Sequence, residues 1–368
     1  MDISIQFVDI TLNMSLQIVT LGFIGGILSG FIGSGGAFFM TPGMMNVGVE
    51  GVVAVASNIA HKFGKAMVGS RKHGEAGNVD KKLAGYLLAT AIIGIQLAVW
   101  INSLLFKGHG EGESKGAGAN LYISLVFVGI LLFVAISMLR DSLRSTKNAE
   151  TGPSRKIVEF FRRLNLPPVI YFKTADTKVS LWILLVVGTA TGFLAGTIGV
   201  GGFIGVPAMI YIIGVPTAVA AGTELYLAMF MGAYGALSYA FQGFVDIRLT
   251  MLLYLGSLLG IYLGVYGVKV VNEKYIRLVT SLIIILCVIS RGIAIPMYLR
   301  QLGIVSLPPE WDAHFNLASK FFLFFSGISG TIVILYQVIK AYRQRRRLHQ
   351  TLQVVNQPGN LQPKFVQG

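Results

Sequence analysis

The chain has few charged residues and a single cysteine. Only 12% of its 368 residues are charged and 54% are hydrophobic, whereas a soluble domain carries roughly 25% charged residues. The lone Cys287 excludes an intramolecular disulfide and a cysteine-cluster metal site. No Walker motif is present, so ATP is not expected to act directly, and we expect no metal or other cofactor. An ordinary aqueous globular protein is therefore excluded.

Long apolar runs take the place of the missing charge, and several reach the ~20 residues that a membrane-spanning helix needs. They are Leu83–Phe106, Leu121–Leu139, Leu249–Val271, Leu278–Ile289 and Phe321–Ile339. The formal net charge of +14 collects in the loops between these runs and in the tail, as the positive-inside rule expects. The sequence predicts an all-α polytopic membrane protein, with the lipid bilayer rather than nucleic acid as its partner.

One Gly-rich stretch occurs twice, at Gly22–Pro42 and at Gly188–Pro207, with its glycines 166 residues apart. Each copy has a ladder of small residues, then a glycine break, then a proline. The breaks are Gly33-Ser34-Gly35-Gly36 and Gly199-Val200-Gly201-Gly202. A repeated unit of this kind predicts a duplicated transporter-like architecture in which each copy carries a broken, re-entrant helix.

The duplication divides the chain into five segments. We expect an N-terminal transmembrane repeat (1–139), a basic cytoplasmic linker (140–178), a C-terminal transmembrane repeat (179–299), a loop with an extra span (300–339) and a basic disordered cytoplasmic tail (340–368). In the linker, Ile157, Phe160, Phe161 and Leu164 have the spacing of an amphipathic helix on an anionic membrane face. A solvated linker helix fits these residues equally well.

The loop charges predict the orientation. The 71–82 loop has a net charge of +2 and the 140–178 linker +5, whereas the 242–248 loop is neutral. Basic segments stay in the cytoplasm, so the 71–82 and 242–248 loops, which are equivalent in the two copies, face opposite sides. The sequence therefore predicts inverted repeats, with the N-terminus outside and the C-terminus in the cytoplasm.

A glycine break inside a membrane exposes backbone groups, which is tolerable only where protein or a water-filled cavity satisfies them. A helix that begins after the break aims its N–H groups and positive dipole end at the break, which suits an anion. The alternative is that the glycines only permit close helix packing. We assign packing to the ladders and ligand contact to the breaks, because Gly-x-Gly-Gly removes more side chains than packing requires.

Polar residues form one stripe on the span that follows the first break: Asn58, His61, Lys62 and Lys65. Ionisable residues inside a span are costly and mark functional or paired groups. We interpret Lys65 as an interfacial lysine and Lys62 as the group that holds an anion; His61 fits ligand binding and core hydrogen bonding equally. Glu224, equivalent to Asn58 in the second copy, is either a proton carrier or a buried counter-ion of Lys62.

Two other classes of function compete with a transporter. A passive anion channel could form from the same cavity. Ser34 and His61 could be read as an intramembrane serine-hydrolase pair, but Val200 replaces Ser34 in the second copy and no third residue orients the pair. We expect no catalytic residue and no enzyme activity.

The two Gly-rich spans that end in Gly-x-Gly-Gly, each followed by a proline, resemble the TauE/SafE family of sulfite exporters, also called toluene-sulfonate uptake permeases. The resemblance covers about residues 15–106 and 179–295. It implies movement of sulfite, sulfonates and related sulfur-containing anions across the bacterial inner membrane. With the inverted repeats, we expect a secondary transporter for sulfite or an organosulfonate, and protonation of Glu224 makes proton coupling one option. The sequence leaves the oligomeric state open, a homo-oligomer included. The expected substrate-binding residues are Gly33, Ser34, Gly35, Gly36, Asn58, His61, Lys62, Gly199, Val200, Gly201, Gly202, Thr223 and Glu224.

The predicted sidedness can be tested by labelling. Single cysteines at Asn78 and Gly243, in a Cys287→Ser background, should react with an impermeant thiol reagent from opposite sides of the membrane, because their loops differ in charge. Labelling of both positions from the same side would contradict the inverted repeat.

Overall fold

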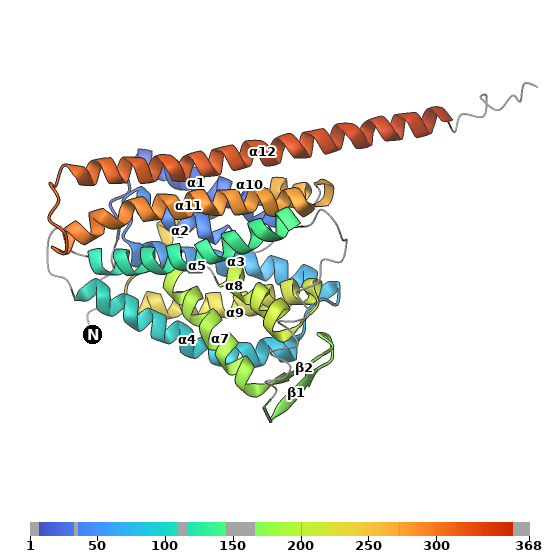
Figure 1. Ribbon diagram of the computed structural model, residues 1–368, viewed down its shortest axis with the longest axis horizontal. Helices are drawn as coiled ribbons and strands as arrows, with labels where there is room; N and C mark the ends of the chain where they lie inside the picture. The colour runs from blue at the N-terminus through green and yellow to red at the C-terminus, as the bar shows by residue number, and fades with distance from the viewer. Residues whose placement is uncertain are drawn as a thin grey trace, which may run out of the picture.

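The protein is almost entirely helical (Figure 1). The computed structural model describes residues 7–32, 36–108, 116–144, 166–199, 201–271 and 273–355. The helices of the first copy are α1 (Leu12–Ile32), α2 (Ala37–Asn46), α3 (Gly51–Glu75), α4 (Lys81–Lys107) and α5 (Ala117–Arg144). The second half holds a hairpin of β1 (Val169–Phe172) and β2 (Thr177–Ser180), then α7 (Leu181–Ile198), α8 (Gly202–Ala208), the π-helical turn η1 (Met209–Ile213), α9 (Thr217–Phe241), α10 (Ile247–Val270), α11 (Glu273–Gln301) and α12 (Trp311–Val355).

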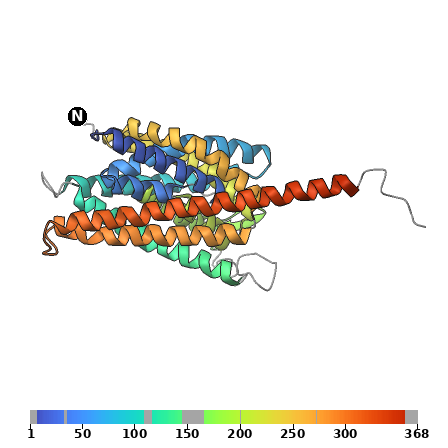
Figure 2. The ribbon, with the colours of Figure 1, turned by 90° about the horizontal axis from the view of Figure 1, so that it is seen from above.

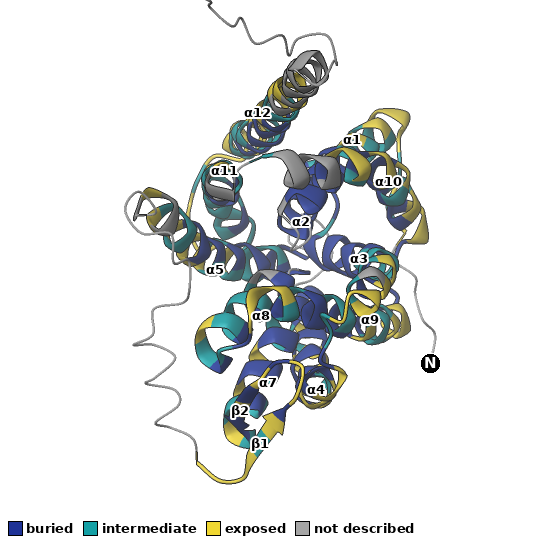
Figure 3. Ribbon diagram, turned by 90° about the vertical axis from the view of Figure 1, so that its right-hand side faces the viewer, coloured by how far each residue is buried: buried dark blue, intermediate teal, exposed yellow. Residues whose placement is uncertain are grey.

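Seven helices in the described part of the chain are long and apolar enough to cross a membrane: α1, α4, α5, α7, α10, α11 and α12. The all-α polytopic membrane protein that the sequence predicts is thereby confirmed. Helices α3 and α9 have 25 residues each but are less apolar. In a view along the helices, α2 and α3 lie at the centre of the bundle and are mostly buried (Figure 3). The polar stripe of the sequence therefore lies inside the protein.

Helices of the two copies pack closely against each other at equivalent glycines. A Cβ on Gly22 of α1 would lie 2.6 Å from the carbonyl oxygen of Leu253 in α10. A Cβ on Gly188 of α7 would lie 2.7 Å from the carbonyl oxygen of Leu87 in α4. Both residues of the second contact are 166 positions from those of the first, so the contacts are reciprocal. Only glycine permits backbones to approach this closely, and the packing role expected for the ladders agrees with these contacts.

The equivalent helices α3 and α9 pack against each other and run antiparallel. Gly232 lies against Phe63, and Gly69 lies against Leu225, so one helix ascends as the other descends. Antiparallel equivalent helices are the relation that inverted repeats require. The sidedness of the two copies in a membrane stays a prediction.

Helix α2 folds back along α1 after the first break. Gly43 of α2 lies against Leu21 of α1, and Gly25 of α1 lies against Met40 of α2. Helix α7 ends at Ile198 and is followed by Gly199, whose φ of 77° lies in the left-handed region that favours glycine. The glycine breaks therefore end the long helices and return the chain as short helices, as a re-entrant helix requires.

Two aspartates that lie 166 residues apart accept hydrogen bonds from the backbone segments that precede α1 and α7. Asp80 caps α4 by accepting from Leu83 N (2.9 Å) and also accepts from the backbone N–H of Thr174 (3.1 Å). Asp246 accepts from Val8 N (3.2 Å) and from the side chain of Arg248 (2.7 Å). Burial alone would raise the pKa of Asp246, but the hydrogen bonds from Arg248 and from backbone N–H groups hold it below its usual value.

The structure differs from the sequence expectations at three places. The end of the linker forms a β-hairpin, which no alternation of apolar residues had indicated, and residues 157–164 lie outside the described part of the chain. The loop expected over 300–315 is shorter, because α12 begins at Trp311. Helix α12 also continues to Val355, where we expected disorder from residue 340, and it extends beyond the other helices (Figure 2). No Gly or Pro interrupts residues 340–355, which explains the longer helix.

The close contact of α4 and α7 predicts a difference between two glycine substitutions. A Cβ on Gly192 would overlap the backbone of Ala91, whereas a Cβ on Gly85 would meet nothing within 4 Å. Gly192→Ala should therefore destabilise the protein by about 1–3 kcal/mol, and Gly85→Ala should leave its stability unchanged or slightly higher. Thermal unfolding of the purified protein measures both. Equal midpoints for the two variants would refute the packing role.

Candidate functional site

The carbonyl groups at the end of α7 are all satisfied by protein donors. A helix leaves its last four carbonyls without a partner in the helix. Ala195 O accepts from Gly199 N (2.9 Å), and Ile198 O accepts from the Thr41 hydroxyl (3.2 Å). Gly196 O accepts from the Tyr239 hydroxyl (2.7 Å), and Thr197 O accepts from Asn102 Nδ2 (3.3 Å). The last four carbonyls of α7 are therefore not free to repel an anion at the second break.

Asn58 and Thr41 are residues of the first copy that lie beside the second break. Asn58 Nδ2 donates to Thr41 Oγ1 (2.8 Å) and to Ala37 O in the first turn of α2 (3.1 Å). A Cβ on Gly199 would lie 3.1 Å from Thr41 Oγ1 and 3.2 Å from Asn58 Nδ2. The start of α2, the middle of α3 and the end of α7 thus meet at the centre of the bundle.

The next turn of α3 places Lys62 at the same junction. Its ammonium nitrogen lies 3.4 Å from the position that a Cβ on Gly201 would take, so it lies at the start of α8. Gly36 and Gly201 occupy the N-cap positions of α2 and α8, and neither offers a side chain that accepts a hydrogen bond from the first turn. Lys62 and two helix starts without side-chain caps supply positive charge to this region.

The space beside Lys62 is small in this structure. The cavity has a volume of about 10 Å³ and is lined by Lys62, Gly196, Gly199 and residues of α9 that include Ala228 and Met231. Such a volume holds about one water molecule. An oxyanion with several heavy atoms needs a larger space, so this structure represents a closed form of the site.

Glu224 lies on the opposite side of the junction, in α9. It is 3% exposed, and neither carboxylate oxygen has a hydrogen-bond partner among the described residues. The carboxylate lies against Gly205 of α8, where a Cβ would overlap it. The Glu224 and Lys62 charges are near enough to interact, but the Glu224 oxygens accept no hydrogen bond from Lys62. The direct pairing that the sequence left open is absent from this closed form.

Two of the expected site residues point elsewhere. His61 Nε2 lies 2.7 Å from the Ser257 hydroxyl of α10, and its ring lies 4.7 Å from that of Tyr254. The Thr223 hydroxyl accepts from Asp80 N (3.0 Å), at the start of α4. Both side chains therefore join α3 or α9 to neighbouring elements rather than to the break.

The expected site is thus only partly assembled in the described residues. Gly36, Asn58, Lys62, Gly199, Gly201, Gly202 and Glu224 lie in the breaks or on the helices beside them, whereas Gly33, Ser34, Gly35 and Val200 lie outside the described part of the chain. Sequence reasoning missed Thr41 and Gly205. Thr41 directly precedes the motif proline Pro42, and Gly205 lies two residues before Pro207, so their places in the repeated motif could have indicated them.

The arrangement suits reversible binding better than catalysis. A lysine ammonium, an amide and two helix starts can hold an anion without forming a bond to it. In the described residues, the histidine that a hydrolase would need is hydrogen-bonded to Ser257. No group of three or more His, Cys, Asp or Glu side chains that could hold a metal ion occurs in this part of the chain.

Comparisons with known proteins identify the family of the chain. The family model described as "Sulfite exporter TauE/SafE" matches residues 18–291. The "Probable membrane transporter protein YjnA" of Bacillus subtilis (strain 168) is 27% identical over 252 residues, which cover 68% of this chain and 89% of that protein. The "Probable membrane transporter protein YdhB" of the same organism is 22% identical over 258 residues, with 68% and 88% covered. No solved structure matches the chain.

The family match covers both glycine breaks, the polar stripe of α3 and Glu224. The match ends at Arg291, within α11 and before the extra helix α12. The chain is a multi-pass membrane protein that belongs to the TauE/SafE sulfite exporter family of membrane transporters.

Proposed function

We propose that the protein is a secondary transporter for a small sulfur-containing anion, sulfite or an organosulfonate, and that Lys62 holds the anion between the two glycine breaks. The observation that carries the proposal is the Lys62 ammonium beside Gly201, at a junction where every end carbonyl of α7 is already satisfied. A fixed positive charge offsets the cost of bringing an anion into a low-dielectric interior. The sulfur chemistry of the substrate comes from the family alone.

The closed cavity favours alternating access over a channel. A cavity of about 10 Å³ cannot conduct an oxyanion in this form, so the anion needs a rearrangement of the helices around it. The reciprocal contacts of α1 with α10 and of α4 with α7 provide two equivalent units that can rock about the site. In the same proposal the protein lies in the bacterial inner membrane, with its N-terminus outside and its C-terminus in the cytoplasm.

Glu224 is the proposed proton carrier. A carboxylate that is buried without a donor is stable only when it takes up a proton or when a cation stands against it. The charged group near Glu224 is Lys62, and Lys65, one turn further along α3, interacts with Lys62. Protonation of Glu224 leaves the Lys62 charge free for the anion, so that proton and anion bind together.

Lys62→Gln should weaken anion binding at least about tenfold, because it removes the charge that touches the site and keeps a polar side chain of similar length. The thermal shift of purified protein with sulfite measures the effect. Lys81→Gln, which removes an exposed lysine at the start of α4, serves as the matched control. Affinity of the wild-type magnitude in Lys62→Gln would refute the proposed site.

Glu224→Gln should bind the anion with an affinity that no longer depends on pH. In the wild type, a fall in pH favours protonated Glu224 and should strengthen binding; glutamine imitates the protonated form at every pH. Ethanesulfonate is the suitable ligand, because a sulfonate stays ionised over the whole range. Persistence of the wild-type pH dependence in Glu224→Gln would assign the coupling proton to another group.

A further inference from the structure

A second pocket lies at the other end of α2, on the face that carries the N-terminal segment. It has a volume of about 430 Å³. Its lining includes the polar side chains of Asp9, Thr11, Asn13 and Gln17, and Lys320 of α12. It is far larger than the closed cavity beside Lys62 and is open to the surface.

The equivalent junction of the second copy is closed, although it is built on the same backbone plan. Thr11 and Val47 both line the pocket, whereas their equivalents Thr177 and Ile213 are joined by a hydrogen bond from the Thr177 hydroxyl to Ile213 O (3.1 Å). Thr11 uses its hydroxyl instead to accept from Met14 N (3.2 Å). The pocket thus lies where the second copy has the hydrogen bond that closes its junction.

Several of the residues that line the pocket in the first copy are polar, whereas their equivalents in the second copy are apolar. The second copy places Ala175, Val179 and Ile183 where the first copy places Asp9, Asn13 and Gln17. Ala175 and Val179 are 1% and 2% exposed, whereas Asp9 and Asn13 are exposed. The fold itself therefore accepts apolar residues at these positions, and the polar lining of the first copy requires another explanation.

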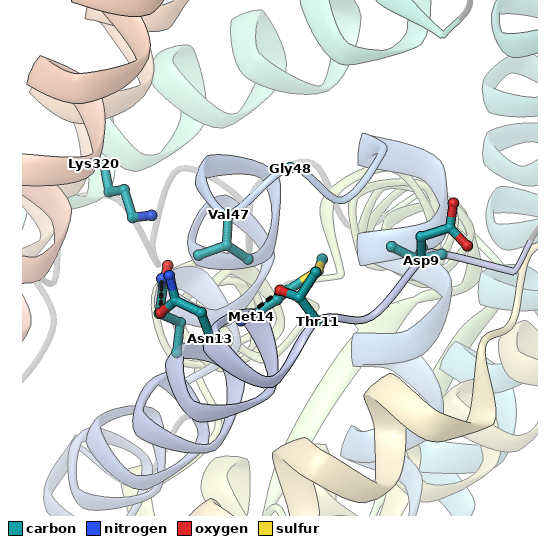
Figure 4. Close-up of a pocket in the computed structure, with 9 residues that line it drawn as sticks. Asp9, Thr11, Asn13, Met14, Val47, Gly48 and Lys320 are labelled. Atoms are coloured by element: carbon teal, nitrogen blue, oxygen red, sulfur yellow. Dashed lines mark hydrogen bonds between the residues drawn. The ribbon is translucent and has the colours of Figure 1, made fainter.

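Two positive charges stand on one side of the pocket. Lys320 points its ammonium group toward Asn13 across the opening (Figure 4). Arg291, which is 1% exposed, donates to Asn46 Oδ1 and to the Ser319 hydroxyl (3.3 Å). These two partners directly precede the lining residues Val47 and Lys320 in sequence, so the guanidinium binds residues that adjoin two parts of the lining.

The neighbouring acid does not cancel these charges. No carboxylate of the described residues forms an ion pair with Arg291 or Lys320. The carboxylate of Asp9 lies on the other side of the pocket and is turned away from Lys320 (Figure 4). It interacts electrostatically with Arg248 instead. The Lys320 side of the pocket is therefore positive. Asn13 Oδ1 accepts from Gln17 Nε2 (2.9 Å), and the Asn13 amide nitrogen can donate to a small anion.

We propose that this pocket is an outer vestibule for the transported anion, in which Lys320 makes the contact and buried Arg291 adds a second fixed charge. The inference rests on the proposed function for the identity of the anion. A positive, partly enclosed opening raises the local concentration of anions and the rate at which they arrive. The vestibule reaches the C-terminal end of α2, and the Lys62 site lies near the N-terminal end of the same helix.

A thiol probe tests the vestibule without knowledge of the substrate. In Cys287→Ser, Asn13→Cys protein, the reaction rates with an anionic (sulfonatoethyl) and a cationic (trimethylammonioethyl) methanethiosulfonate give a ratio that reports the local potential. Lys320→Gln should lower the anionic-to-cationic ratio at least about threefold, and high salt should reduce the difference. Lys320→Arg should keep the ratio. Lys81→Gln, an exposed lysine at the equivalent junction of the second copy, should leave it unchanged.

The same variants distinguish the vestibule from the central site. Lys320→Gln should raise KM for ethanesulfonate transport from the N-terminal face with little change in kcat, whereas Lys62→Gln should abolish transport. If the anionic-to-cationic rate ratio is the same in Lys320→Gln as in Lys81→Gln, the vestibule proposal is wrong. If the wild type moves no sulfonate, the proposed substrate is wrong, but the reagent ratio still decides the vestibule. Arg291→Met should also lower the anionic-to-cationic ratio, and an unchanged ratio would show that Arg291 does not contribute to the vestibule. If Arg291→Met does not fold, the comparison of Lys320→Gln with Lys320→Arg still tests the vestibule.

Discussion

A helix that is interrupted inside a membrane protein must have its free backbone groups satisfied by other parts of the protein, and this constraint organises the centre of the molecule. At the second break, donors from Gly199, Tyr239, Asn102 and Thr41 satisfy the last four carbonyls of α7. Gly199 directly follows α7, and the other three donors come from α2, α4 and α9, so the end of α7 holds three other helices in place. The closely packed glycines bring these helices near enough to reach the break.

The two copies share their scaffold but differ in their chemistry. Equivalent glycines pack α1 against α10 and α7 against α4, and equivalent aspartates fasten the segments that precede α1 and α7. At the centre, however, Lys62 is matched by Ala228, which lines the same small cavity. A symmetric scaffold with one cation on one side can hold a single anion near the axis that relates the copies. Two equivalent lysines there would repel each other in the empty state.

The sequence predicted most of the fold because hydrophobicity and the 166-residue repeat are properties of the chain itself. It predicted less of the site, because helical spacing defines a face of a helix but not its neighbour. His61 and Lys62 are adjacent, and one residue turns the side chain by about 100° around the helix. In a helix buried on several sides, that rotation sends His61 to Ser257 of α10 and Lys62 to the start of α8. The capping contacts of Thr41 and the opening beside Lys320 arise from tertiary packing and have no signal in spacing.

Helix α2 connects the two proposed anion sites, and its dipole explains why a buried arginine belongs at one of its ends. The N-terminal end lies at the glycine break, where its partial positive charge favours an anion. The C-terminal end carries partial negative charge toward the vestibule and by itself would repel the same anion. Arg291 contacts Met45 and Asn46, the last two residues of that helix. The guanidinium thereby compensates the negative helix end, and an anion that moves along α2 meets positive charge at both ends.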